Sequence, residues 1–339
     1  MASVTESAFD VLTIGNAIVD IISTAEEDIL VTLGVTKGMM RLIDAAEASR
    51  IYALMGPAVE TSGGSAANTA AGVASFGGRA AYIGKVAADE FGDIFRHDMR
   101  SQGVHYGTVA LSGGAPTARC MVLVTPDSER TMNTYLGACH QLTEADIDEN
   151  VVGGASHTYL EGFLWDPPAA KLAFRKAATI AHAHGRTVSL TLSDSFCVDR
   201  FRAEFLDLVR SGTVDMVFAN KEEAKSLYET GDIDTAIACL ARDCKLGAVT
   251  LGGDGAVAFR GDEMVSAPAF PVDDLVDMTG AGDQFAAGFL YGISHALPLA
   301  AAARLGCLAG SECVGHIGPR PGCSLGQLAA DHGLLPHRH

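Results

Sequence analysis

The sequence has few positive charges for its size. Its 339 residues include 24 Lys and Arg against 41 Asp and Glu, which gives a net charge of −17 with neutral histidines. Nucleic acids and anionic membrane surfaces bind to basic faces. The charge balance therefore argues against both partners. It also means that a bound phosphate has to be held locally, by backbone N–H groups, bound cations and a few basic residues.

Paired cysteines and a secretory leader are also missing. The eight cysteines contain no CxxC pair, and residues 1–10, MASVTESAFD, lack the basic and apolar regions of a leader. We therefore expect reduced thiols and a cytoplasmic protein. A zinc site is disfavoured, because His182 and His184 are two residues apart on an expected helix and point in different directions.

One long stretch, residues 285–303, has no charged side chain. Gly288, Gly292 and Pro298 interrupt it. Proline disfavours helical backbone just before it and readily opens a new helix. We expect two short core helices that meet near Pro298 in a soluble protein, rather than a membrane span.

Two common nucleotide-binding motifs are absent. The stretch GRAAYIGKV has five residues between Gly78 and Gly84 where a P-loop has four, and Val86 stands where a P-loop needs a magnesium-binding hydroxyl. This stretch is therefore interpreted as a strand. No GxGxxG motif follows an expected strand, which weighs against a dinucleotide-binding Rossmann domain.

The chain does contain a regular alternation of expected strands and helices. With 48% hydrophobic residues it can bury a substantial core, and no internal repeat or low-complexity linker divides it. Such alternation implies right-handed βαβ units and a largely parallel sheet covered on both faces. We expect one α/β domain over residues 1–339. Expected strands include 80–86, 156–164, 187–194 and 215–220, and expected helices include 65–78, 89–103 and the segment from an N-cap at Asp166 to about His184.

Two segments break this alternation. Residues 18–42 and 108–136 each have the pattern of a strand pair, and the second pair is expected to turn at residues 126–129, PDSE. We expect these two segments to form a lid over the α/β core.

The most informative motif is DMTGAGDQFAAGF, residues 277–289. Gly280 and Gly282 lack Cβ and allow a ligand to approach the backbone, and the first N–H groups of the following helix have no partner inside that helix. Such a turn can hold an anion. A carboxylate beside a bound phosphate, Asp283, has the position of a general base. The alternative is an ordinary helix start with Asp283 in the first turn.

A second glycine-rich passage, residues 63–92, lies upstream: GGSAANTAAGVASFGGRAAYIGKVAADEFG. Together the two passages resemble the signature pair of the ribokinase-like (PfkB) family of sugar and nucleoside kinases. The resemblance extends from about residue 9 to about residue 321. It implies a three-layer αβα sandwich with a mostly parallel sheet and a small β lid, and phosphorylation of a hydroxyl by ATP. It makes Asp283 the base and the backbone of Gly280, Ala281, Gly282 and Asp283 the anion hole.

The resemblance also assigns residues to the acceptor. Asp20 stands where the family places an acid that accepts hydrogen bonds from two neighbouring hydroxyls, Gly63 and Gly64 where the backbone lies against the acceptor, and Asn68 where an amide contacts the sugar. Arg130 is expected to bridge the transferred phosphoryl group and its acceptor. The alternatives are an exposed acid at a strand end, a turn, a polar helix residue, and a surface arginine paired with Glu129.

Further residues are assigned to the nucleotide. Asn220 and Glu223 resemble the NxxE motif, whose acid acts on Mg2+ through water. A capping box at a helix start is the alternative, and both roles are compatible. Residues Thr250, Gly252, Gly253 and Gly255 resemble the loop beneath the nucleotide, with a hairpin turn as the alternative. Asp277 and residues 313–318 resemble segments that bind a monovalent cation such as K+ in some relatives.

The acceptor is judged from less specific residues. The stretch RTMNTYLGAC is similar to the corresponding strand of adenosine kinases, and Phe163 stands where such enzymes place an aromatic side chain near the purine. Met39 or Met40 of the lid is expected to complete a slot for the base, with sheet-end core as the alternative role for all three. In contrast, GGSAANT is nearer to many sugar kinases.

We therefore expect an ATP- and Mg2+-dependent kinase that phosphorylates the 5′-hydroxyl of adenosine or a close nucleoside. The alternative enzyme is a sugar kinase acting on ribose, fructose or 2-keto-3-deoxygluconate. The alternative outside enzymes is a nucleoside-binding sensor, which would need neither Asp283 nor the anion hole. The sequence leaves a monomer and a homodimer open.

Overall fold

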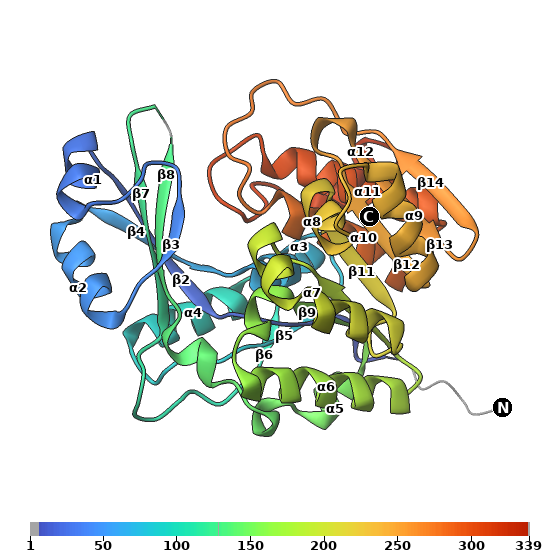
Figure 1. Ribbon diagram of the computed structural model, residues 1–339, viewed down its shortest axis with the longest axis horizontal. Helices are drawn as coiled ribbons and strands as arrows, with labels where there is room; N and C mark the ends of the chain where they lie inside the picture. Colours follow the sequence, from blue (N-terminus) through green and yellow to red (C-terminus); the bar gives the residue numbers. More distant parts are fainter. Residues whose placement is uncertain (1–6, 128, 338–339) are drawn as a thin grey trace.

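The structure is a computed structural model that describes residues 7–127 and 129–337 (Figure 1). Its larger part is built on a nine-stranded sheet of order β14-β13-β12-β11-β10-β9-β1-β5-β6. Neighbouring strands are parallel from β6 to β12, and the pairs β12–β13 and β13–β14 are antiparallel. The strands are β1 (Phe9–Ile14), β5 (Ala80–Ile83), β6 (His105–Tyr106), β9 (Ala155–Glu161), β10 (Thr187–Thr191), β11 (Met216–Asn220), β12 (Leu246–Thr250), β13 (Ala256–Arg260) and β14 (Glu263–Ala267).

Helices cover both faces of this sheet, because successive side chains of a strand point to opposite faces and both sets are apolar. In β1, Val11 packs among the helices of one face and Leu12 among those of the other. The first face carries α3 (Ser65–Ser75), α4 (Glu90–Ser101), α10 (Ala281–Ser294), α11 (Leu299–Cys313) and α12 (Leu325–Asp331), and the second carries α5 (Glu149–Gly153), α6 (Pro168–Ala183), α7 (Ser195–Arg210), α8 (Lys221–Leu227) and α9 (Ile233–Asp243).

A second, five-stranded sheet of order β3-β8-β7-β2-β4 stands beside the larger part (Figure 1). In β2, Val19 and Ile21 face the helices on the outer side of this sheet, whereas Asp20 faces the inner side. The expected three-layer αβα sandwich with a small β lid is therefore confirmed. The lid contains β2 (Ile18–Thr24), β3 (Met40–Leu42), β4 (Ala58–Gly63), β7 (Ala118–Val124) and β8 (Arg130–Tyr135), with α1 (Glu27–Leu33) and α2 (Ala45–Leu54) on its outer side.

One lid segment differs from the expectation. Residues 18–42 do not form a strand pair, because α1 separates β2 from β3, and β2 pairs with β4 and β7 instead. Leu30 and Leu33 are buried three residues apart, and Gly34 ends the helix with a φ of 65°. This spacing and stop are helical signals, and they outweigh the β-rich flanks. The second expected pair, β7 with β8, is antiparallel as predicted, and Ser128 of its turn lies outside the described residues.

Two helix boundaries test the sequence analysis. The break at Pro298 is confirmed, since α10 ends at Ser294 and Pro298 is the N-cap of α11. The N-cap of α6 is Pro167 and not Asp166, because Asp166 keeps helical backbone angles at the end of a 3-10 helix, Gly162–Trp165, and its side chain pairs with Arg200. Within residues 7–127 and 129–337, no helix is long and apolar enough to cross a membrane.

Glycine brings α10 and α11 into close contact. A Cβ atom at Gly288 would lie 2.5 Å from the carbonyl oxygen of Leu305. A Cβ atom at Gly282, in the exposed first turn of α10, would meet nothing within 4 Å.

We therefore expect Gly288→Ala to lower the free energy of unfolding by about 1–3 kcal/mol, since overpacking against backbone outweighs the ~0.5–1 kcal/mol that alanine adds to a helix interior. Gly282→Ala is the matched control and should leave stability unchanged or raise it. Urea denaturation measures both, and equal midpoints for the two variants would contradict this account of the α10–α11 contact.

Candidate active site

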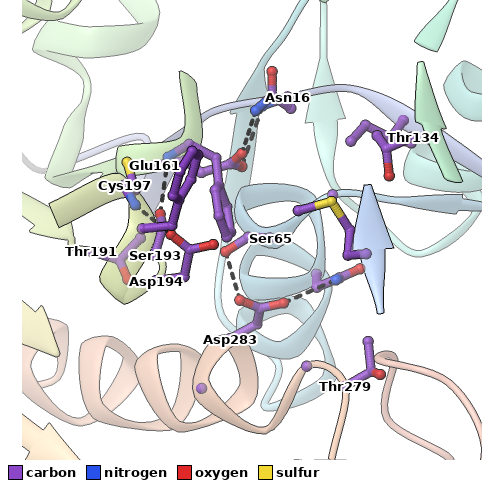
Figure 2. A pocket seen from close by; sticks show the side chains of 18 of the residues that line it. Asn16, Ser65, Thr134, Glu161, Thr191, Ser193, Asp194, Cys197, Thr279 and Asp283 are labelled. Carbon is purple, nitrogen blue, oxygen red and sulfur yellow. Dashed lines mark hydrogen bonds between the residues drawn. The ribbon is translucent and has the colours of Figure 1, made fainter. Parts of the chain in front are cut away.

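A cavity of about 1040 Å³ lies between the inner face of the lid and the carboxyl ends of the central strands (Figure 2). Ligands of open α/β sheets bind at this edge, because the strands end there and the helix N-termini point toward it. From the lid come Asp20, Met40 and Thr134, and from the core come the strand ends and the starts of α3, α7, α8 and α10. The cavity is thus a junction of segments far apart in the sequence.

Asp283 lies at the start of α10, where Gly280 opens the helix with a φ of 83°. The Ser65 hydroxyl donates to one oxygen of its carboxylate at 2.6 Å, and the Asn68 amide donates to the other at 3.0 Å (Figure 2). Burial raises the pKa of Asp283 to about 6, although these two hydrogen bonds and the charge of Arg320 lower it. The carboxylate is therefore held in one orientation and is ionised at neutral pH, as a base must be.

Asp20 is the second acid of the cavity. It lies in the middle of β2 on the inner face of the lid, so the interpretation as an exposed acid at a strand end is wrong. Burial raises the pKa of its carboxyl to about 7, against the lowering effect of Arg320 and Arg130. Gly63 is buried behind it, where a Cβ atom would collide with the carboxylate, and Gly64, with a φ of 96°, lines the cavity. Gly63 thus makes room for Asp20, while Gly64 exposes backbone.

Glu161 is a buried acid that the sequence analysis did not single out. Its carboxylate accepts hydrogen bonds from the backbone N–H and side-chain amide of Asn16, at 3.2 and 2.7 Å, and from the N–H of Ala66 at 2.9 Å (Figure 2). Burial raises its pKa to about 7. Glu161 therefore connects the end of β9, the segment between β1 and β2, and the first turn of α3. No motif marked it, because its three donors come from two distant segments.

Asn220 and Glu223 form a capping box at the start of α8. The Asn220 side chain accepts from the N–H of Glu223 at 2.9 Å, and Glu223 accepts from the Asn220 N–H at 2.9 Å and amide at 2.6 Å. The interpretation of Asn220 and Glu223 as a capping box is thus confirmed. Both residues also line the cavity, and burial, with the charges of Asp194 and Asp283, raises the pKa of Glu223 to about 7.

The glycine loop after β12 is a hairpin turn into β13. Thr250 lines the cavity, whereas Gly252 and Gly253 are exposed in a 3-10 turn, Gly252–Asp254. Gly255 has a φ of 91° and packs against the carbonyl oxygen of Ala267. The hairpin interpretation is therefore confirmed, and of these four residues only Thr250 reaches the cavity wall.

Arg130 makes an ion pair across the gap between lid and core. Its guanidinium lies 3.0 Å from the carboxylate of Asp277, and the two side chains are only 11% and 6% exposed. Asp277 also accepts from the N–H of Thr279 at 3.0 Å and of Gly318 at 2.9 Å. Arg130 is therefore not a surface arginine paired with Glu129. It connects the start of β8 to the segment that leads into α10.

Apolar side chains form another part of the cavity wall. Phe163 is 37% exposed and lines the cavity with Phe196, Met39 and Met40. The N–H of Phe163 bonds to the Ser193 hydroxyl at 3.0 Å, which fixes the backbone beside the ring. The alternative role of Phe163, Met39 and Met40 as sheet-end core is therefore wrong. These side chains form one face of the open space.

Comparisons with known proteins agree with this geometry. Residues 30–324 match the sequence model of the pfkB family of carbohydrate kinases. Fructokinase-1 of Oryza sativa subsp. japonica is 30% identical over 238 residues, which cover 68% of this chain and 73% of the relative.

Two solved bacterial structures are more similar. The adenosine kinase from Sinorhizobium meliloti is 57% identical with a TM-score of 0.89, over 96% of this chain and 99% of that one. The probable sugar kinase protein from Rhizobium etli CFN 42 is 56% identical with a TM-score of 0.91, over 97% and 100% of the two chains.

The ion pair between Arg130 and Asp277 is expected to hold the lid against the core. Asp277→Asn removes a charge-assisted hydrogen bond worth about 1.5–3 kcal/mol. Because the lid can open to solvate Arg130, we expect local opening and not global unfolding to respond, with hydrogen exchange in β7 and β8 faster by about 10- to 100-fold. Asp207→Asn, which breaks the exposed pair with Arg175 on the core, is the control. Unchanged exchange in the lid would show that the ion pair does not hold it.

Proposed function

The chain belongs to the pfkB family of carbohydrate kinases and is a phosphotransferase with a hydroxyl acceptor, and from this premise we propose that it transfers the γ-phosphoryl group of ATP to the 5′-hydroxyl of adenosine or a close nucleoside. One observation carries the proposal. A single cavity joins a hydrogen-bonded carboxylate, Asp283, to an acid suited to a diol, Asp20, and to an apolar wall around Phe163. A nucleoside has three matching parts: a primary hydroxyl, a ribose diol and a flat base.

Asp283 acts as the base in this proposal. Its ionised carboxylate takes the proton of the 5′-hydroxyl as the oxygen attacks phosphorus. The N–H groups of Gly282 and Asp283 in the first turn of α10 have no helical partner and meet the negative charge that develops on the phosphoryl oxygens. The N–H of Ala281 lies beside them and donates to the Met278 carbonyl oxygen at 3.3 Å. Gly282 faces open space, which leaves the backbone accessible. In this proposal Arg130 adds positive charge when it leaves Asp277.

On the nucleotide side, Glu223 is the acid that acts on Mg2+ through water. It lines the cavity, and burial, with a smaller contribution from the charge of Asp283, raises its pKa, so a cation bound near Glu223 would favour its ionised form. Bound Mg2+ supplies charge neutralisation between the nucleotide phosphates. Asn220 and Thr250 complete this side, with the turn at Gly252, Gly253 and Gly255 beneath the nucleotide. A monovalent cation such as K+ near Asp277 stays a prediction.

The acceptor side is assigned in the same way. Asp20 accepts from the 2′- and 3′-hydroxyls, Asn68 and the backbone at Gly64 contact the ribose, and Phe163 with Met39 or Met40 stacks on the base. The Rhizobium and Oryza relatives bear sugar kinase names, and the GGSAAN passage is shared with that class. A sugar kinase acting on ribose, fructose or 2-keto-3-deoxygluconate is therefore the second candidate.

Replacement of the base tests the chemistry. Asp283→Asn should lower kcat by on the order of 10² to 10⁴, because the amide cannot accept the hydroxyl proton, while ATP binding persists. Asp274→Asn, an exposed acid of the preceding loop, is the control and should retain full activity. A nucleoside-binding sensor would show a nucleoside-dependent rise in melting temperature and no turnover even in the native protein. Near-normal kcat in Asp283→Asn would remove this residue from the mechanism.

Acceptor preference tests the substrate. Loss of one hydroxyl leaves part of the Asp20 carboxylate unpaired, so kcat/KM for 2′-deoxyadenosine should fall by the equivalent of about 1–3 kcal/mol, and ribose, which lacks the base, should be poorer still. Phe163→Ala should lower kcat/KM for adenosine and leave that for ribose unchanged. If ribose or fructose exceeds adenosine in the native enzyme, the nucleoside proposal is wrong and the sugar kinase takes its place.

A further inference from the structure

Arg320 is a partly buried arginine that no motif pointed to. It lies between α11 and α12 and extends its guanidinium to the seam between the core and the lid. Nε donates to the Asn68 side-chain oxygen at 2.8 Å, Nη1 to the Gln102 side-chain oxygen at 2.7 Å, and Nη2 to the Ser62 hydroxyl at 3.1 Å. These contacts connect α3, the C-cap of α4 and β4, and of these three partners Asn68 on α3 lines the cavity.

The hydrogen-bond partners of Arg320 are neutral. Among the described residues, no carboxylate lies within ion-pair distance of its guanidinium. A buried cation without a direct counterion is costly, and burial lowers the pKa of Arg320 to about 10. Its charge acts at longer range on Asp20, Asp98 and Asp283. Two of these three acids are the ones that face the acceptor.

Donor and acceptor chemistry determines what Arg320 does to Asn68. A guanidinium has only donors, so it can face only the oxygen of the Asn68 amide. The amide nitrogen then faces the opposite way, toward Asp283, where it donates at 3.0 Å. An ionised carboxylate has only acceptors, so the orientation set by Arg320 is the one that supports ionised Asp283. Without the arginine, the amide is free to turn its oxygen toward Asp283, and this favours the protonated acid.

We propose that Arg320 is a positioning residue that fixes the Asn68 amide and, with its charge, keeps the proposed base Asp283 ionised and oriented. This inference rests on the proposed function of Asp283. A merely structural arginine that ties α3, α4 and β4 together is the competing account. The two differ in one respect, because only a positioning role changes the protonation of Asp283.

Other charged groups around Asp283 have the opposite effect. Glu161 at the end of β9 and Glu223 on α8 each have a pKa raised in part by the charge of Asp283, as do Tyr159 on β9 and Cys313 on α11. By reciprocity, Glu161 and Glu223 oppose ionisation of Asp283 when they are themselves ionised, whereas Tyr159 and Cys313, whose pKa values are raised by burial, stay neutral. Arg320 lowers it. Removal of the arginine charge therefore raises the pKa of Asp283, and the acidic limb of activity moves to higher pH.

The test compares Arg320→Gln and Arg320→Lys with the native enzyme in the pH dependence of kcat/KM. The native limb should lie near pH 6. In Arg320→Gln it should move up by about one pH unit, so that the loss of activity relative to the native enzyme is about fivefold greater at pH 6 than at pH 8. Arg320→Lys keeps the charge and should leave the limb in place. A loss of equal size at every pH, or an unmoved limb in Arg320→Gln, overturns the proposal.

A second variant, Gln102→Glu, tests the same inference if Arg320→Gln does not fold. Gln102 is exposed, and Gln102→Glu places a negative charge against Nη1 without removing a hydrogen bond of Arg320. The limb should again move to higher pH, by less than in Arg320→Gln. Gln327→Glu, the same change on the exposed side of α12, is the matched control and should not move it.

A readout without turnover separates this inference from the proposed function. The carboxyl 13C resonance of Asp283, identified by its loss in Asp283→Asn, reports the same pKa in the protein without substrates. A higher pKa in Arg320→Gln than in the native protein supports the inference whichever acceptor is used, even if adenosine is not phosphorylated. An unchanged pKa refutes the inference about Arg320 but does not contradict the proposed kinase activity on adenosine.

Discussion

The site depends on an ionised carboxylate held in a buried position where two helices meet. Asp283 belongs to α10, and both of its donors, Ser65 and Asn68, belong to α3. The helices can approach because Gly72 of α3 has no side chain, and a Cβ atom there would lie 2.6 Å from Cβ of Ala287. The packing of two glycine-containing helices therefore places the donors, and the donors stabilise the charged form of Asp283 against burial.

The cavity gathers negative charge at the place where an anionic nucleotide has to bind. Asp20, Glu161, Glu223 and Asp283 all have pKa values raised by burial to about 6 or 7. Such an arrangement has to be offset by cations, because each buried charge raises the pKa of its neighbours. Arg130 and Arg320 are the protein's own contribution, and both act on Asp20. A bound metal ion would extend the same compensation to the phosphates, in a chain of net charge −17.

The residues proposed for the chemistry and the residues proposed for the choice of acceptor lie in different parts of the structure. The proposed anion hole and base come from one turn of α10 and its α3 partners. The residues proposed to contact the acceptor are Asp20 and the methionines of the lid and Phe163 of the core, which come from separate strands and a 3-10 turn. Relatives with similar folds and different names, an adenosine kinase and a probable sugar kinase, are therefore consistent with one catalytic core.

The sequence by itself determined the fold class, the two glycine-rich passages and the position of Asp283 in the first turn of a helix, because these depend on local periodicity, missing Cβ atoms and helix starts. It also predicted the capping box of Asn220 with Glu223 and the break at Pro298, which are short-range interactions. It missed the helix α1, although the signals of that helix, the spacing of Leu30 and Leu33 and the stop at Gly34, are local. It failed also where a residue's role depends on distant partners. The inward position of Asp20, the Glu161 hydrogen bonds and the Arg130–Asp277 pair appear only when β2, β8 and β9 are brought to one cavity. Arg320 is the clearest case, since the carboxylate it acts on is 37 positions away and the amide between them is 252 positions away. Hydrogen bonds and charges act through space, and only the tertiary structure decided which of these groups would be neighbours.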